Sequence, residues 1–329
     1  MKRIGIIGAG AWGTALATVV RRAGREVIIR AHEPEVTVAI NTRHTNPDYL
    51  PDIPLDPAIQ ATDDFAEAAG ADVVLLATPA QFARAAVNAI APHLAKGTPV
   101  VICAKGIEQA TGKLLSEAIS DTAPNITTAV LSGPTFADEV ARGLPTAVTL
   151  ACNNMDTANA LAETLGTPTF RPYASRDVVG AQIGGALKNV IAIACGIVDG
   201  RGLGQNARAA TIARGLAEMA RFGDALKADP RTLMGLSGLG DLTLTCTSVA
   251  SRNYTVGKAL GEGATPDDVK IGRRTVAEGV FTAPAVLTRG KALGVELPIC
   301  AAIDTILHDN ADIDVTIGEV LARPLRPEV

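Results

Sequence analysis

A single lysine lies in the middle of a long apolar run. Residues 183–198 contain one charged side chain, Lys188, and one amide beside it, Asn189. An ammonium buried without a partner is costly, and burial lowers the pKa of a lysine until it can exchange a proton near neutral pH. Lys188 is therefore a candidate acid/base catalyst. A lysine at the edge of a helix, or one in a structural ion pair, would give the same pattern.

Two further polar residues follow predicted strands. Lys105 ends the apolar run 100–104, and Thr135 comes shortly after the run 128–131. In parallel sheets, ligands collect at the carboxyl ends of the strands. Both side chains are therefore expected near a ligand, with an ordinary loop position as the alternative for each.

The later part of the chain contains a carboxylate and a group of donors. Asp241 is the one charged residue in the glycine-rich stretch 238–245, and Ser251, Arg252 and Asn253 follow ten residues later. A guanidinium matches the oxygens of a phosphate with two parallel hydrogen bonds. The group predicts a site for an oxyanion. A helix cap for Asp241 and a surface charge for Arg252 are the alternatives.

Three glycines form a GxGxxG motif between an apolar run and a helical pattern. Gly8, Gly10 and Gly13 follow the run 3–8 and open a predicted helix over about 12–23. In this context Gly8 makes the tight turn, Gly10 lets the backbone approach a pyrophosphate, and Gly13 lets the helix pack on the strand. The N–H groups at the helix start then face the phosphates. The motif predicts a bound dinucleotide.

The residues after the second predicted strand bear on the choice between NAD and NADP. An acidic side chain about 20 residues after the glycines binds the ribose hydroxyls of NAD, whereas a nearby arginine favours the extra phosphate of NADP. Here Arg30, His32 and Glu33 stand close together, so both signals are present. The predicted cofactor is NAD or NADP, without a preference.

The secondary structure predicted to position these residues differs between the two halves of the chain. Up to about Ser175, short apolar runs followed by turn residues alternate with helical patterns, which is typical of a parallel sheet covered by helices on both faces. The predicted strands are 3–8, 26–30, 73–77, 100–104, 128–131, 147–151 and 168–171, and the intervening helices are 12–23, 81–91, 111–120 and 156–165.

Beyond Ser175 the strand signals end. Helical patterns cover 176–198, 206–223, 230–236, 252–261, 280–293 and 298–309. We therefore predict an α/β fold in which a Rossmann-like parallel-sheet domain over 1–180 binds the dinucleotide. An all-helical domain over 181–329 is expected to bind the substrate.

Composition excludes several classes of protein. The 329 residues suit two domains, and a hydrophobic content of 47% with only 3% aromatic residues predicts an aliphatic core. The net charge is −4 and basic residues are scattered, so nucleic acid is not an expected partner. No membrane span is predicted, because the longest apolar run carries Lys188. Five dispersed cysteines without ligand spacing predict a reducing cytoplasm, with neither disulfides nor a metal site.

Together these residues resemble bacterial NAD(P)-dependent glycerol-3-phosphate dehydrogenases over nearly the whole chain. The combination of Lys188-Asn189, Asp241-Leu242 and 251–253 is more specific than the glycine motif. The resemblance implies reversible reduction of dihydroxyacetone phosphate to sn-glycerol 3-phosphate, which supplies the backbone of glycerophospholipids. The matching stretches are 8–17, 46–51, 104–107, 133–140, 184–192, 238–246, 251–253 and 276–280.

The resemblance also implies roles for individual residues. Lys188 would accept the proton when glycerol 3-phosphate is oxidised, with Asp241 and Lys105 completing the catalytic group. The implied substrate contacts are Lys105, Gly133, Thr135, Lys188, Asp241, Ser251, Arg252 and Asn253. The implied cofactor contacts are Gly8, Gly10, Ala11, Trp12, Gly13, His32, Glu33, Tyr49, Lys105, Ala137, Arg252, Val276 and Glu278. Two positions depart from the family, which commonly has arginine at position 32 and frequently serine at position 11.

Two other functions are compatible with parts of the pattern. A related two-domain dehydrogenase of a hydroxy acid or sugar acid would need a clamp for a carboxylate instead of a phosphate. The second alternative is a binding protein that senses a dinucleotide. It would not explain why Lys188, Asp241 and Arg252 occur together. The expected partner is a small-molecule substrate, and the aliphatic helices are compatible with a homodimer.

Overall fold

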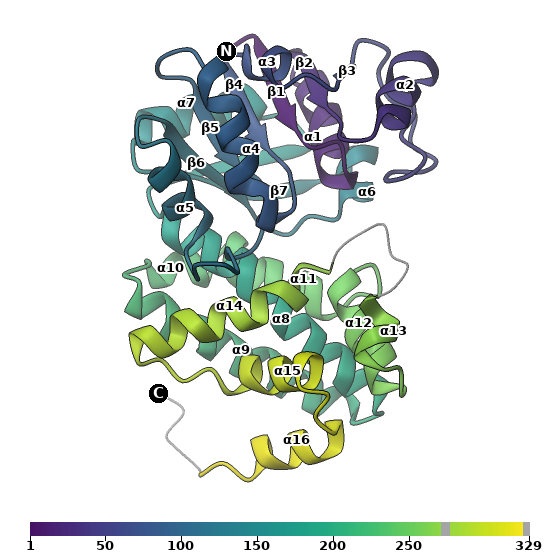
Figure 1. The fold of residues 1–329 in the computed structure, drawn as a ribbon, viewed down its shortest axis with the longest axis vertical. Helices are drawn as coiled ribbons and strands as arrows, with labels where there is room; N and C mark the ends of the chain where they lie inside the picture. Colours follow the sequence, from purple (N-terminus) through teal and green to yellow (C-terminus); the bar gives the residue numbers. More distant parts are fainter. Residues whose placement is uncertain (271–276, 325–329) are drawn as a thin grey trace.

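The computed structural model describes residues 1–270 and 277–324, so Val276, an expected cofactor contact, lies outside the described residues. In the described part of the first half, eight strands form one sheet in the order β3-β2-β1-β4-β5-β6-β7-β8 (Figure 1). Neighbouring strands are parallel except β6 and β7. The strands are β1 (Arg3–Ile7), β2 (Glu26–Arg30), β3 (Gln60–Thr62), β4 (Val73–Leu76), β5 (Pro99–Ile102), β6 (Thr127–Ser132), β7 (Thr146–Cys152) and β8 (Phe170–Ser175).

Helices cover both faces of this sheet, which explains why the strands are apolar at consecutive positions. Successive side chains of a strand point to opposite faces, and accordingly Ile6 of β1 joins the core beneath α1, whereas Ile7 joins the core beneath α4. The helices of this half are α1 (Ala11–Arg22), α2 (Pro34–Arg43), α3 (Phe65–Ala69), α4 (Ala83–Ile90), α5 (Leu115–Thr122), α6 (Ala137–Arg142) and α7 (Met155–Leu165), with short 3₁₀ turns η1 (Ala80–Phe82) and η2 (Ala91–His93).

The strand order reverses at β1, which lies between β2 and β4. In open α/β sheets, ligands bind outside the carboxyl ends of the strands at such a point. Residues 8–13 follow β1, Ala80 follows β4, and Lys105 follows β5. The topology therefore places these three segments at the same edge of the sheet, where a ligand is expected.

All the described secondary-structure elements of the second half are helices, and this half lies beside the carboxyl edge of the sheet (Figure 1). The long helix α8 runs through its centre and packs against α9, α11, α12, α14 and strand β6. The elements are α8 (Val178–Gly200), α9 (Gly204–Ala225), α10 (Pro230–Leu233), the π-helix η3 (Leu236–Gly240), α11 (Asp241–Cys246), α12 (Arg252–Gly261), α13 (Pro266–Lys270), α14 (Glu278–Leu293), α15 (Pro298–His308) and α16 (Ile313–Leu321).

Helix α8 is long and apolar enough to cross a membrane, but its most apolar stretch is entirely buried within the protein. It therefore serves as the core helix of this half. Its backbone touches that of α12, because a Cβ at Gly196 would lie 2.1 Å from the carbonyl oxygen of Tyr254, and one at Gly257 would lie 1.9 Å from that of Ile193. These glycines bring the two helices into direct backbone contact.

The predicted fold class is confirmed, and the strands at 26–30, 73–77 and 147–151 are found within one residue of their predicted ends. The last strand was wrongly placed at 168–171, since β8 occupies Phe170–Ser175. The predicted helix 111–120 begins only at Leu115, after a turn closed by Glu108 and Gly112. Sequence patterns missed β3, α2, α3, α6, α11, α13, α16 and the π-helix, most of them too short to show a periodicity.

Candidate active site

Asp241 joins the two lysines that the sequence singles out. Its Oδ1 accepts a hydrogen bond from the Nζ of Lys188 at 2.5 Å, and its Oδ2 accepts one from the Nζ of Lys105 at 2.7 Å. The Asp241 side chain is 0% exposed, and that of Lys188 is 7% exposed. Two ammonium groups and one carboxylate are thus held together at the junction between the sheet and the helical half.

Two glycines of α8 allow this close approach. A Cβ at Gly185 would lie 2.9 Å from the Oγ of Ser132 and 3.3 Å from the Cγ of Lys105, so the Lys105 side chain runs directly across the helix. A Cβ at Gly184 would lie only 2.0 Å from the carbonyl oxygen of Ser237 in the π-helix. Because the π-helix ends at Gly240, directly before Asp241, its contact with Gly184 sets where this carboxylate enters the site. π-Helical turns are frequent at functional sites.

The two lysines differ in how many of their donors the protein uses. The Nζ of Lys105 donates three hydrogen bonds, to oxygens of Asp241, Gly133 and Thr135 at 2.7, 2.8 and 3.2 Å. Lys188 donates to Asp241 and, at 2.9 Å, to the Oγ1 of Thr245. An ammonium has three donors, so these two contacts within the described residues leave one N–H of Lys188 for a ligand, and the deprotonated amine has a lone pair.

The surroundings of Lys188 tune its proton affinity. Burial lowers the pKa of Lys188 to about 8, an effect that the Asp241 carboxylate opposes and the positive charge of Lys105 reinforces. A group with this pKa exists in both protonation states near neutral pH, as general acid/base chemistry requires. The cluster can therefore both donate and accept a proton.

The glycine turn after β1 has the geometry of a phosphate cradle. Gly8 has φ +110°, and a Cβ there would lie 2.8 Å from the carbonyl oxygen of Ala77. A Cβ at Gly13 would lie 1.8 Å from the Gly8 oxygen, so α1 packs on the turn. By contrast, a Cβ at Gly10 would meet nothing within 4 Å, which leaves open space at the N-terminus of α1. The residues fit a dinucleotide pyrophosphate at this position.

Several polar side chains lie next to this turn and after β2. The Nε1 of Trp12, in the first turn of α1, is buried and lacks a partner among the described residues. The Glu33 carboxylate accepts a hydrogen bond from the hydroxyl of Tyr49 at 2.8 Å. Arg30 lies over the Phe65 ring, 4.1 Å from its centroid, and His32 is exposed. An oriented carboxylate and an exposed imidazole are thus the polar groups at this end.

The predicted oxyanion group begins helix α12. The Oγ of Ser251 caps the helix by accepting from the N–H of Tyr254 at 3.2 Å, and Arg252 is exposed at the first helical position. Asn253 donates to the Oδ1 of Asn189, the neighbour of Lys188, at 2.9 Å. The structure therefore connects the start of α12 to the lysine cluster through two amides.

Glu278 connects the helical half back to the sheet. Its Oε1 accepts a hydrogen bond from the backbone N–H of Ala80 at 3.1 Å. Burial raises the pKa of Glu278 to about 6, while the charge of Arg252 acts in the opposite direction. Of the other expected contacts, Gly133 and Thr135 bind Lys105, and Ala137 starts α6 against the core of the sheet.

Sequence reasoning missed two contributors. Thr245 holds Lys188, and its place four residues after Asp241, on the same face of a helix, was a usable signal. Ala80 acts through its backbone N–H, for which a side-chain pattern gives no signal.

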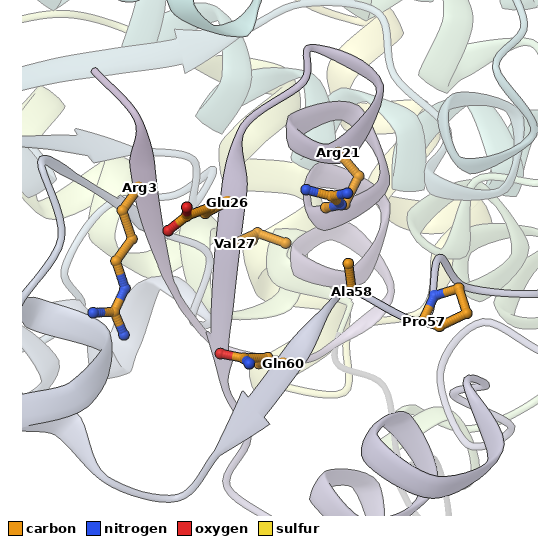
Figure 2. A pocket seen from close by; sticks show the side chains of 7 residues that line it. All are labelled: Arg3, Arg21, Glu26, Val27, Pro57, Ala58 and Gln60. Atoms are coloured by element: carbon orange, nitrogen blue, oxygen red, sulfur yellow. The ribbon is translucent and has the colours of Figure 1, made fainter.

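A cavity of about 460 Å³ opens elsewhere, at the amino ends of β1–β3 (Figure 2). It lies at the opposite end of these strands from the glycine turn and includes none of the predicted site residues.

Comparisons with known proteins agree with this geometry. The N-terminal model of the NAD-dependent glycerol-3-phosphate dehydrogenase family matches residues 3–158, and its C-terminal model matches 177–318. Proteins described as glycerol-3-phosphate dehydrogenase [NAD(P)+] from Caulobacter vibrioides and Rhodospirillum rubrum are 52% and 57% identical. The alignments cover 99% of this chain in both cases, and 99% and 93% of the two relatives.

Solved structures place the chain in the same group. The glycerol-3-phosphate dehydrogenase of Coxiella burnetii is 36% identical with a TM-score of 0.94, covering 98% of this chain and 99% of that one. A complex of D-mandelate dehydrogenase with NADH is 19% identical with a TM-score of 0.63, covering 94% and 98%, and shares the fold alone. The chain therefore belongs to the family of NAD-dependent glycerol-3-phosphate dehydrogenases.

Proposed function

We propose that the protein catalyses the reversible, NAD(P)-dependent interconversion of dihydroxyacetone phosphate and sn-glycerol 3-phosphate. Full-length relatives described as glycerol-3-phosphate dehydrogenase [NAD(P)+] support this reaction. Within the structure, the observation that carries it is the buried Lys188–Asp241–Lys105 cluster, which supplies a proton donor and acceptor beside the dinucleotide edge of the sheet.

In this proposal Lys188 moves the proton. When the ketone is reduced, the ammonium of Lys188 gives a proton to the new alkoxide oxygen, and when the alcohol is oxidised the neutral amine accepts it. Asp241 holds Lys188 in place and stabilises its charged form. Lys105, whose donors are all used by the protein, fixes Asp241 and Thr135 from the sheet side. General acid/base help of this kind contributes about 10²–10⁴-fold.

The start of α12 is proposed to hold the substrate phosphate. Arg252 offers a planar set of donors, and the N-terminus of a ten-residue helix adds free N–H groups and a positive dipole end. Asn253 donates to Asn189, the neighbour of Lys188 in sequence, so a phosphate held here would lie at the same level along α8 as Lys188. The remaining proposed substrate contacts are Gly133, Thr135, Lys188, Asp241 and Ser251, together with Lys105, which would exchange one of its three protein acceptors for the substrate.

The cofactor is NAD or NADP, and when bound its nicotinamide donates or accepts the hydride. The Gly8–Gly13 turn is proposed to hold the pyrophosphate through the N–H groups that begin α1. Glu33, oriented by Tyr49, is proposed to bind the adenosine ribose. The remaining proposed contacts are Ala11, Trp12, His32, Lys105, Ala137, Arg252 and Glu278.

We also propose the wider setting of this enzyme. The product supplies the backbone of glycerophospholipids, and the enzyme works in the cytoplasm, where its free, buried cysteines stay reduced. A dinucleotide-binding domain over 1–180 and a substrate-binding domain over 181–329 form the chain, which assembles as a homodimer. Limited proteolysis between the two halves and sedimentation analysis test the last two points.

The direct test of the reaction is reduction of dihydroxyacetone phosphate, followed with NADH and NADPH in parallel. We expect turnover with at least one of the two cofactors, and the ratio of the two rates establishes the preference. Matched assays with 3-hydroxyisobutyrate and 6-phosphogluconate are the control. Turnover of either acid, with none of the ketone, would reject the proposal in favour of a hydroxy acid or sugar acid dehydrogenase.

A further inference from the structure

Asn46 is a fully buried amide that lies behind the glycine turn after β1. Its Nδ2 donates hydrogen bonds to the carbonyl oxygen of Ala9 and to the Oγ1 of Thr14, both at 2.8 Å. Its Oδ1 is buried and has no hydrogen-bond partner among residues 1–270 and 277–324. A buried acceptor without a partner destabilises the folded protein, so stability alone does not account for an amide at this position.

A short turn of the chain fixes Asn46 in this place. The N–H groups of Tyr49 and Leu50 donate to the Asn46 carbonyl oxygen at 3.4 and 2.8 Å. Leu50 is buried in the core beneath α1, which anchors the segment 46–50 to the sheet. The Asn46 side chain is therefore held against the glycine turn by contacts at both ends of this segment.

Two side chains converge on one backbone oxygen of the glycine turn. The Oγ1 of Thr14, which accepts from Asn46, itself donates to the Ala9 carbonyl oxygen at 3.2 Å. The turn is also held by a backbone contact, from the Gly8 N–H to the carbonyl oxygen of Arg30 at 3.0 Å. In the described part of the chain, Asn46 and Thr14 are the side chains that bond to the backbone of residues 8–10.

The direction of the Ala9 oxygen determines the direction of the next N–H group. In a planar trans peptide the C=O and the N–H point in opposite directions, so the Gly10 N–H points away from Asn46. Within the described residues this N–H has no acceptor, and a Cβ at Gly10 would meet nothing within 4 Å. If the peptide rotated, its carbonyl oxygen would face the open side and would repel a phosphate.

We propose that Asn46 is a positioning residue for the cofactor: together with Thr14 it holds the Ala9–Gly10 peptide so that the Gly10 N–H faces the dinucleotide pyrophosphate. This inference rests on the proposed function and extends it. The group that faces the Ala9 oxygen has to be a donor, which the NH₂ of an amide supplies and a carboxylate of the same shape does not. Asn46 thus prepares the phosphate site from behind, where it touches no ligand itself.

The test measures the dissociation constants of ADP and NADH by the fluorescence of Trp12, the one tryptophan in the chain. Asn46→Ala and Thr14→Val should each bind both ligands about tenfold more weakly, because both ligands carry the pyrophosphate and a hydrogen bond to a charged group is weakened. Thr14→Ser keeps the hydroxyl and should bind ADP as the wild type does.

Asn41→Ala is the matched control. The Asn41 amide also makes two hydrogen bonds to backbone groups, with the oxygen and the N–H of Ala61 at 2.9 and 2.8 Å, but these connect α2 to β3. This variant should lose stability in urea and keep the ADP affinity of the wild type. The comparison separates the loss of a buried amide from the loss of the turn's anchor.

Two double-mutant cycles identify how Asn46 acts on the ligand. The effects of Asn46→Ala and Thr14→Val on ADP affinity should be non-additive, because both side chains hold the same carbonyl oxygen. The effects of Asn46→Ala and Tyr49→Phe should add, because the Tyr49 hydroxyl acts on Glu33 at the ribose end. The opposite pattern would mean that Asn46 acts through Tyr49 and would overturn the inference.

Kinetics give a readout that a general loss of structure would not produce. In Asn46→Ala the KM for NADH should rise about tenfold, while kcat at saturating NADH should change less than about threefold, because the Lys188 cluster is untouched. A lower kcat with an unchanged KM for NADH would indicate a smaller fraction of folded enzyme and would overturn the inference.

Unchanged ADP affinity in Asn46→Ala would also overturn it. If this variant does not fold, Thr14→Val and Thr14→Ser decide, and equal ADP affinity in these two proteins rejects the positioning role. ADP binding requires no ketone, so these results are independent of the reaction. Absence of dihydroxyacetone phosphate turnover in the wild type, with the predicted ADP pattern intact, would reject the proposed function and keep the role of Asn46.

Discussion

Replacing Lys188 with methionine removes the central ammonium and keeps a side chain of similar length. Asp241 retains its ion pair with Lys105, so the carboxylate is not left without a counter-charge. We expect turnover of dihydroxyacetone phosphate to fall about 10²–10⁴-fold, the usual contribution of a general acid/base. Binding of NADH should survive, since the glycine turn after β1 is untouched.

The same substitution has a predictable effect on stability. Burial lowers the pKa of Lys188 from 10.5 to about 8, so at pH 7 the folded protein is destabilised by about 3 kcal/mol relative to an unperturbed lysine. Between the two pKa values the unfolded chain binds more protons than the folded one, so this destabilisation disappears as pH rises. Wild type should therefore gain about 2 kcal/mol over Lys188→Met between pH 7 and 9.5.

Urea unfolding of both proteins at pH 7 and 9.5 measures this difference, and any constant offset from packing cancels. Lys96→Met, at an exposed position, is the matched control and should show little change with pH relative to wild type. A gain near zero would show that Lys188 does not titrate in this range. Turnover of Lys188→Met within threefold of wild type would reject its catalytic role.

Four other outcomes follow from the same geometry. Asp241→Asn leaves the buried ammonium of Lys188 and the partly buried ammonium of Lys105 without their anion, so unfolding free energy in urea should fall by about 3–5 kcal/mol and ketone reduction should be lost. Gly185→Ala places a Cβ 2.9 Å from the Oγ of Ser132. The overpacking should cost about 1–3 kcal/mol, which outweighs the gain of about 1 kcal/mol from the higher helix propensity of alanine, so the melting temperature should fall. In pH–rate profiles, kcat/KM for alcohol oxidation should rise through about pH 8 as Lys188 loses its proton, and kcat/KM for reduction should fall there. Arg252→Ala should raise the KM for dihydroxyacetone phosphate about tenfold or more, and an unchanged KM would remove its clamp role.

Much of the fold is visible in local sequence patterns. Strands buried on both faces read as continuous apolar runs, and the glycine motif after the first run identifies the dinucleotide edge. The lone charge in the run 183–198 by itself identifies Lys188 as a functional candidate. These features depend on burial and on backbone conformations that act within a few residues.

The contacts between distant segments required the tertiary structure. Asp241 lies 53 residues from Lys188 and 136 from Lys105, and Ala80 lies 198 residues from Glu278. The pattern of apolar and polar residues indicates that a polar side chain such as Lys188 stands in an unusual position in the sequence. It does not identify the hydrogen-bond partner of that side chain. The partner of each group is determined where glycines allow helices and strands to come into backbone contact. The distance between the backbones there determines which donors and acceptors can meet. The burial of the Asp241 carboxylate between two lysines belongs to this second kind of information, since no local pattern contains it.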